Sequence, residues 1–201
     1  YTWDTVLVNG NQSHNADSGG WGESLLHARM NPGTTADSAL HAGSKGRDDD
    51  ELWNRVPLAL RSIMVTVDKR YYNGSILKSG VNATLQVARD KLFLLSYSET
   101  VSSTATYRSR WEKVADEGDA YPWYESKGVA GNTDASGNAG NKWVAKRQVQ
   151  QDGSLGSTDW VWWLRTTYPE DVHYFCSIQN NGYMWRDVNS VIAGICPAFC
   201  V

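Results

Sequence analysis

The chain has few cysteines, no excess of positive charge and no long hydrophobic run, and each of these absences excludes a class of protein. Three cysteines in 201 residues are an odd number and do not form the framework of a disulfide-rich scaffold. With 19 Lys and Arg against 22 Asp and Glu, the chain lacks the basic excess of nucleic-acid-binding proteins, so we expect no nucleic-acid partner. Its apolar runs are far shorter than the roughly 18 residues that span a bilayer, so we expect no membrane insertion.

The sequence opens with Tyr1-Thr2-Trp3-Asp4, without a Met, a basic segment or an apolar segment typical of a signal peptide. We therefore interpret the chain as the C-terminal part of a longer protein. Its length suits one large domain, and too little sequence follows the polar stretch 112–158 to build a second core. We expect a single domain over residues 1–201.

Ten Trp, ten Tyr and 18 Gly are the informative surplus. Large amphipathic rings supply rigid contact area, and glycines supply turns. This composition is typical of a loop-rich domain that binds a partner.

Hydrophobic spacing predicts two helices in the first third of the chain, within 19–30 and over 51–64, the second carrying Pro57 near its first turn. Strands are predicted at 63–67 and 91–95, with a connecting excursion over 71–88. Ser96 and Glu99 have the spacing of a capping box. Residues 112–158 are expected to form a surface excursion.

The last 44 residues are predicted to be β-structure. A strand over 160–165 is followed by alternation over 172–179, a hairpin turn at 180–182, a return over 183–187 and a closing edge segment over 191–201. We expect Trp160, Trp162, Trp163 and Leu164 to form the core beneath a surface site, and Arg165 to be a structural anchor.

Several ordered motifs resemble a bacterial and phage domain family whose signature runs W-W-L-R-S, then V-N-S-D-G, then G-V-R-P-A. The corresponding pieces here are Trp162-Trp163-Leu164-Arg165-Thr166, Asn180-Asn181-Gly182 and Gly194-Ile195-Cys196-Pro197-Ala198. Upstream, Gly20-Trp21-x-x-Ser24-Leu25, Val56-Pro57-Leu58 and Lys91-Leu92-Phe93-Leu94-Leu95-Ser96-x-x-Glu99 resemble its earlier elements in the same order. Asn181, Cys196 and His27 depart from the family pattern, in which Asp, Arg and Arg stand at these places.

That family resembles the C-type-lectin-like group, which includes formylglycine-generating enzymes and the variable proteins of diversity-generating retroelements. The resemblance implies an α+β, C-type-lectin-like fold with two helices on a twisted, mainly antiparallel sheet and long irregular loops. It also implies a ligand-binding surface displayed by the C-terminal strands and loops, in a domain that commonly sits at the tip of phage tail fibres.

Polar and aromatic residues around the last hairpin have the composition of a binding surface, in which rigid rings combine with adaptable hydrogen-bonding groups. The candidate ligand-binding residues are Tyr168, Glu170, Asp171, His173, Tyr174, Tyr183, Trp185, Arg186, Asp187, Asn189 and Ser190. Packing of the hairpin itself is the alternative role for about half of them, Trp185 included.

Catalytic, metal and cofactor sites are weaker alternatives. Cys196 and Cys200 would lie about 13 Å apart in an extended strand, too far for the redox pair that the formylglycine enzymes need. Glu170 and Asp171 point opposite ways on an extended segment, and the acidic run 48–51 suits a solvated helix start. The four histidines lack metal-ligand spacing, and no hydrolase or phosphate-loop motif occurs. We expect no enzyme, no catalytic residue, no metal and no cofactor.

The sequence is therefore interpreted as a receptor-binding or adhesive module of a phage tail or virion appendage, with a bacterial cell surface as the other location. Its expected partner is a host cell-surface protein or glycan, and a longer parent chain would allow a homotrimer. The alternative is a structural decoration or assembly module that uses the same surface for subunit packing.

Overall fold

The structure is a computed structural model that describes much of the chain. The described residues are 7–8, 11–12, 19–32, 52–101, 112–127, 147–151, 154–171, 173–180, 182, 184–188 and 193–201.

The elements of the first half are short. In chain order they are β1 (Leu7–Val8), β2 (Asn11–Gln12), the 3-10 turn η2 (Trp21–Glu23), α1 (Leu25–Met30), α2 (Leu52–Arg55), α3 (Leu58–Ile63), β3 (Val67–Tyr72) and β4 (Leu85–Asp90).

The second half begins with helical turns and ends in strands. Its elements are η5 (Ser98–Thr100), η6 (Glu112–Glu117), α4 (Pro122–Ser126), β5 (Arg147–Gln151), β6 (Ser154–Trp160), β7 (Trp162–Thr167), β8 (Tyr174–Ile178) and β9 (Met184–Val188).

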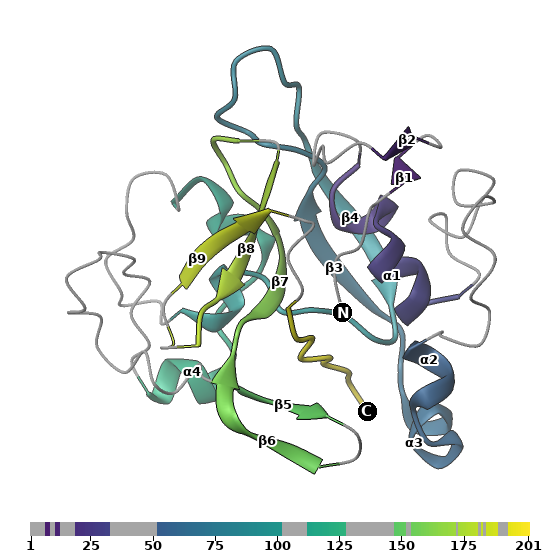
Figure 1. Cartoon of the computed structure of the whole chain (residues 1–201). Coiled ribbons are helices and arrows are strands. Elements are labelled where there is room, and N and C mark those ends of the chain that lie inside the picture. The colour runs from purple at the N-terminus through teal and green to yellow at the C-terminus, as the bar shows by residue number, and fades with distance from the viewer. Residues whose placement is uncertain are drawn as a thin grey trace.

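The fold is α+β, and its strands pair antiparallel, as the sequence predicts. The expected single sheet is divided, among the described residues, into three two-stranded ribbons and one three-stranded sheet, β7-β8-β9. Figure 1 shows this sheet beside the β3–β4 ribbon, with α1, α2 and α3 beyond the ribbon and α4 on the opposite side. The β8–β9 hairpin forms in the predicted place, with Cys176 opposite Arg186 and Ser177 opposite Trp185.

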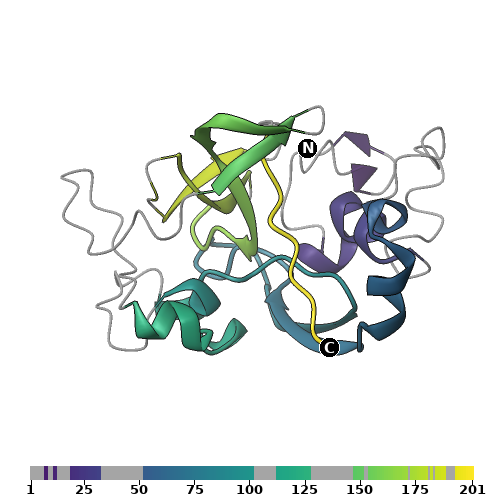
Figure 2. The ribbon, with the colours of Figure 1, turned by 90° about the horizontal axis from the view of Figure 1, so that it is seen from below.

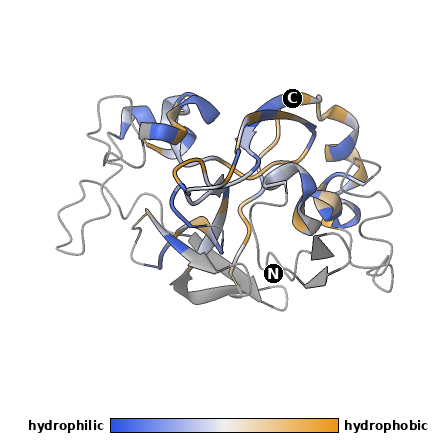
Figure 3. Cartoon of the chain, turned by 90° about the horizontal axis from the view of Figure 1, so that it is seen from above, coloured by the Kyte–Doolittle hydropathy of each residue, from blue (hydrophilic) through white to orange (hydrophobic). Residues whose placement is uncertain are grey.

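The predicted helix over 51–64 is split in two by Pro57. Proline lacks the N–H for a helical hydrogen bond, and its ring collides with the preceding turn. Pro57 has the extended ψ of 138° and instead starts α3, where its carbonyl accepts from the N–H groups of Leu60 and Arg61. Figure 3 shows hydrophobic as well as hydrophilic residues on the short helices, and α3 leaves both Leu58 and Ile63 exposed.

The strands predicted at 63–67 and 91–95 are displaced along the chain. The regular pairing runs from Val67↔Asp90 to Tyr72↔Leu85, inside the stretch expected to be a connecting excursion. Residues 91–95 lie just beyond it and make one bridge, between Phe93 and Ala198. Residues 92–95 are apolar and buried, so their composition resembles that of a strand that is buried on both faces.

The C-terminal segment crosses the molecule without forming a regular strand among its described residues. It makes isolated bridges at Gly194, Ala198 and Cys200, which pair with Trp162, Phe93 and Val65. Figures 1 and 2 show it as an extended trace between the β7–β9 sheet and the β3–β4 ribbon. The sequence predicts an edge strand or a bulge at Pro197. The described part of the segment instead makes only isolated bridges, to Trp162, Phe93 and Val65.

Two hydrophobic clusters meet at β7. Trp163 belongs to the first cluster with Trp21, Leu26 and Leu94, whereas Trp162 and Leu164 belong to the second. Successive residues of a strand point to opposite faces, so adjacent tryptophans serve different clusters. Trp162, Trp163 and Leu164 are buried, which confirms that they are core residues, as the sequence predicts.

Polar contacts attach α1 to the end of β4. His27 Nε2 lies 2.6 Å from Asp90 Oδ1, and Trp21 Nε1 donates to Asp90 Oδ2 at 2.8 Å. Gly20 permits the close approach of this segment to β3. Its φ is 60°, and a Cβ there would lie 2.3 Å from the carbonyl oxygen of Tyr72.

A buried charge cluster, formed by Lys69, Glu99, Glu117 and Arg165, joins the second hydrophobic cluster to β3. Arg165 is fully buried, and its guanidinium donates to Glu99 Oε2 at 2.5 Å. It also donates to three backbone carbonyls, those of Arg70, Leu94 and Glu117. Arg165 is thus the structural anchor predicted from the sequence.

Glu99 also forms an ion pair with Lys69, and its side chain caps the turn to which it belongs. Lys69 Nζ donates to Glu99 Oε1 at 3.0 Å and lies 3.9 Å from the centroid of the Phe93 ring. Glu99 Oε2 accepts from the N–H of Ser96, and the hydroxyl of Ser96 accepts from the N–H of Glu99. This reciprocal pair confirms the predicted capping box, on a 3-10 turn rather than an α-helix.

Replacing Arg165 with Met should lower the free energy of unfolding by about 3–5 kcal/mol, because it leaves the carboxylate of Glu99 buried without its main cation. Urea denaturation measures the change. Arg89→Met is the matched control, since the Arg89–Asp68 pair is largely exposed and should contribute less than about 1 kcal/mol. Equal losses in the two variants would contradict the anchoring role.

Candidate functional site

The candidate site is a group of polar and aromatic residues at the turn between β7 and β8 and along the facing part of β9. The turn is compact because the N–H of Tyr168 donates to the carbonyl of Tyr174, and the N–H of Tyr174 donates to that of Asp171. Pro169 is buried beneath it, and its carbonyl accepts from Leu77, so the 73–84 loop supports the turn.

Arg186 is held against two aromatic rings. Its guanidinium carbon lies 4.4 Å from the ring centroid of Tyr168 and 4.9 Å from that of Tyr174. The two rings meet edge to face, with centroids 6.2 Å apart. Within the described part of the chain no carboxylate is within ion-pairing distance of Arg186. The rings therefore orient a cation that has no anionic partner among the described side chains.

Acidic residues at the same turn are already engaged. The hydroxyl of Tyr168 donates to Glu170 Oε2 at 2.9 Å. Asp171 Oδ1 accepts from the backbone N–H of His173 and lies 2.9 Å from its Nδ1. Burial raises the pKa of Asp171, but the hydrogen bonds from His173 and the charges of His173 and Lys78 together outweigh it and lower that pKa below its ordinary value. This carboxylate is therefore ionised at neutral pH.

The structure gathers only part of the predicted site. Tyr168, Glu170, Tyr174 and Arg186 lie together, with the Asp171–His173 pair at the same turn. We name these six residues the hairpin surface. Tyr168 is itself buried and supports Arg186 rather than facing solvent, which corrects its predicted role as a direct contact.

Trp185 is 44% exposed, but it does not belong to the hairpin surface. It is adjacent to Arg186 in the strand, so its side chain points to the opposite face. Tyr183, Asn189 and Ser190 lie outside the described residues, and the side chain of Asp187 in β9 is also outside them.

Two features of the molecule were not predicted from the sequence. One is the contact between the side chain of Glu117 and Thr166 of β7, and the other is a hollow beside α2. Glu117 lies in η6, inside the stretch expected to be a surface excursion, yet it is buried together with Val114 and Tyr124. No local pattern marks this carboxyl group. The sequence signals for the buried charge cluster are the capping-box spacing of Glu99 and the predicted anchor Arg165.

Glu117 is the group of the cluster with the most altered acidity. Its Oε1 accepts from the N–H of Tyr72 at 3.0 Å, and its Oε2 accepts from the hydroxyl of Thr166. Burial raises the pKa of Glu117 to about 7, against the opposing effects of Arg165, Thr166 and Tyr72. For Glu99, burial also raises the pKa, but Arg165 and Lys69 outweigh it and lower the pKa below its usual range.

A group of three or more His, Cys, Asp or Glu side chains that could hold a metal ion does not occur among the described residues. Cys176, Cys196 and Cys200 are free thiols. In the same part of the chain, no helix is both long and apolar enough to cross a membrane.

The family comparison covers nearly the whole chain. A family model described as a domain of unknown function, DUF6273, matches residues 3–201. The chain belongs to this family. No curated protein and no solved structure matches the DUF6273 chain.

Glu117 should make the stability of this DUF6273 domain depend on pH. Its pKa is higher in the folded than in the unfolded chain, so the folded state binds more protons between about pH 4.5 and 7. The free energy of unfolding of the wild type, minus that of Glu117→Gln, should fall across this window by at most about 1.4 kcal/mol per pH unit and level off above it.

Urea titrations of both variants at four pH values from 4.5 to 8 measure this difference. Arg165 and Lys69 hold the pKa of Glu99 below its usual range, so Glu99 is ionised in both folded variants across this window. A difference that rises with pH would show that Glu117 is ionised in the folded protein throughout.

Proposed function

We propose that this DUF6273 chain is a ligand-display module with a C-type-lectin-like arrangement, in which the hairpin surface binds a host cell-surface protein or glycan. The motif resemblance suggests a phage tail or virion appendage as its setting and a bacterial cell surface as the other. The observation that carries the proposal is the guanidinium of Arg186, which has no carboxylate partner among the described side chains and is held against the rings of Tyr168 and Tyr174.

Rigid support favours recognition at this place. The hairpin surface rests on β7 and β8, whose residues Trp162, Leu164, Cys176 and Ile178 are buried in the second hydrophobic cluster. A cation that is already oriented loses little conformational entropy when it meets a ligand. The guanidinium fork suits carboxylate or sulfate groups, so acidic groups of a protein or glycan are the expected contacts.

A second candidate function is subunit packing, and the exposure of Trp185 favours it. A large aromatic ring that is 44% exposed on an edge strand is typical of residues that become buried at an interface. In this function the module would contribute to assembly of a virion structure or a homotrimer.

Arg186→Gln should weaken ligand binding by about 10–100-fold while changing the free energy of unfolding by no more than about 1 kcal/mol. Binding is measured with the labelled chain on an array of neutral and acidic glycans and on a panel of intact bacterial cells. Arg70→Gln is the control, because Arg70 is an exposed arginine on β3.

Sedimentation of the wild type and Trp185→Ala separates the two functions. Display predicts that the hairpin surface remains accessible and that Trp185→Ala leaves the oligomeric state unchanged. The display function is wrong under two joint results. Sedimentation would show a wild-type oligomer that Trp185→Ala dissociates, and the binding assays would show that Arg186→Gln leaves all ligand binding intact.

A further inference from the structure

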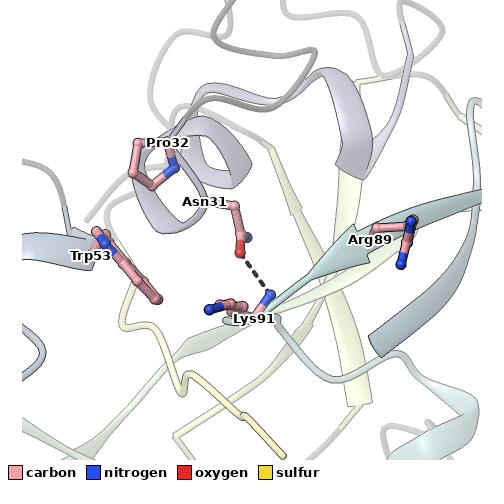
Figure 4. A pocket seen from close by; sticks show the side chains of 5 residues that line it. All are labelled: Asn31, Pro32, Trp53, Arg89 and Lys91. Atoms are coloured by element: carbon pink, nitrogen blue, oxygen red, sulfur yellow. Dashed lines mark hydrogen bonds between the residues drawn. The ribbon is translucent and has the colours of Figure 1, made fainter. Parts of the chain in front are cut away.

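A hollow of about 270 Å³ lies between the end of α1, α2 and the end of β4, in the region of the first hydrophobic cluster and apart from the hairpin surface. Its lining residues are Asn31, Pro32, Trp53, Arg89 and Lys91. Figure 4 shows the indole of Trp53 extending toward Lys91, with Arg89 on the other side of the hollow.

The backbone at the base of the hollow is fixed by Asn31. Its Oδ1 accepts from the N–H groups of Lys91 and Leu92 at 3.0 and 3.1 Å, and its Nδ2 donates to the carbonyl of Leu92 at 2.6 Å (Figure 4). Both acceptor positions and one N–H of the Asn31 amide are therefore used within the protein. Its contacts fix the backbone position from which the side chain of Lys91 leaves the chain.

Strand alternation places the side chains of Arg89 and Lys91 on the outer face and that of Asp90, which lies between them, on the inner face. Asp90 is fully buried, and its two oxygens are engaged by His27 and Trp21. Lys91 makes no ion pair with any described carboxylate, and Arg89 makes only its exposed 3.6 Å contact with Asp68. The hollow consequently contains positive charge and, among its described lining residues, no acidic group.

The apolar part of the lining is flat. Trp53 is partly buried against the first hydrophobic cluster, and the guanidinium carbon of Arg61 lies 5.6 Å from the centroid of its ring. The negative face of an indole attracts the slightly positive C–H groups of a saturated ring. The volume is just below that of typical drug-sized sites, which suits a ligand of a single ring.

We propose that this hollow binds an acidic monosaccharide, with its carboxylate at Lys91, its apolar C–H face on Trp53 and its hydroxyl groups toward Arg89. A neutral sugar would leave the ammonium without an anion. A planar aromatic acid would satisfy Lys91 and Trp53 but has no second polar edge for Arg89 on the other side. The site is independent of the function proposed for the hairpin surface.

Titration of the ¹⁵N-labelled full chain with glucuronate tests the proposal, with glucose as the neutral analogue and benzoate as the aromatic acid, all at constant ionic strength. Glucuronate should shift the backbone amide of Lys91 and the indole N–H of Trp53, and bind at least about tenfold more tightly than glucose or benzoate.

Lys91→Gln should weaken glucuronate binding at least about tenfold, because a charge-assisted hydrogen bond is lost. Lys113→Gln, which removes an exposed lysine on η6, should bind as the wild type does. The side chain of Lys91 makes no described hydrogen bond, so its replacement should leave the melting temperature unchanged. Equal affinity for glucose and glucuronate, tighter binding of benzoate, or unaltered binding by Lys91→Gln would each overturn the proposal.

Discussion

The contact between the buried guanidinium of Arg165 and the carboxylate of Glu99 is the interaction on which the arrangement of this domain depends. Removing a guanidinium from water is costly, and the cost is met only when several acceptors surround it. Here the acceptors come from β3, from the segment that follows β4, from η5 and from η6. One side chain of β7 therefore ties together parts of the chain that are 48 to 95 residues away from it.

This anchoring has consequences on both sides of β7. The second hydrophobic cluster lies against the β7–β9 sheet and carries the hairpin surface, whereas the first lies against α1, α2 and β4 and carries the hollow. Both candidate sites follow one physical scheme. A cation without an acidic partner among the described residues lies beside aromatic rings, Arg186 with Tyr168 and Tyr174 in one site and Lys91 with Trp53 in the other. In the hairpin surface the ring of Tyr168 is buried. In the hollow, Trp53 packs against the first hydrophobic cluster, and Asn31 holds the backbone of Lys91.

The two buried carboxyl groups respond differently to the same surroundings. Glu99 has Arg165 and Lys69 at its two oxygens, so ionisation is favoured. Glu117 has only neutral donors at its side-chain oxygens, and burial dominates its acidity. Perturbed acidity often marks catalytic groups. Here both carboxyl groups are enclosed and hydrogen-bonded between structural elements, which is why we assign their effect to the stability of the fold.

The sequence by itself determined the local features: the β8–β9 hairpin, the capping box at Ser96 and Glu99, the buried pair Trp162 and Trp163, the anchor Arg165 and the α+β class. The hairpin, the capping box and the buried tryptophans depend on near neighbours, through turn geometry, strand alternation or hydrophobicity. The α+β class was implied by the motif resemblance, and the role of Arg165 by its place in a hydrophobic strand. Only the tertiary structure decided the partners of Arg165, the burial of Glu117 and the separation of Trp185 from Arg186 onto opposite faces. It also created the hollow at Lys91. These features join residues distant in the chain, and no periodicity within a short window specifies which buried cation meets which buried acid.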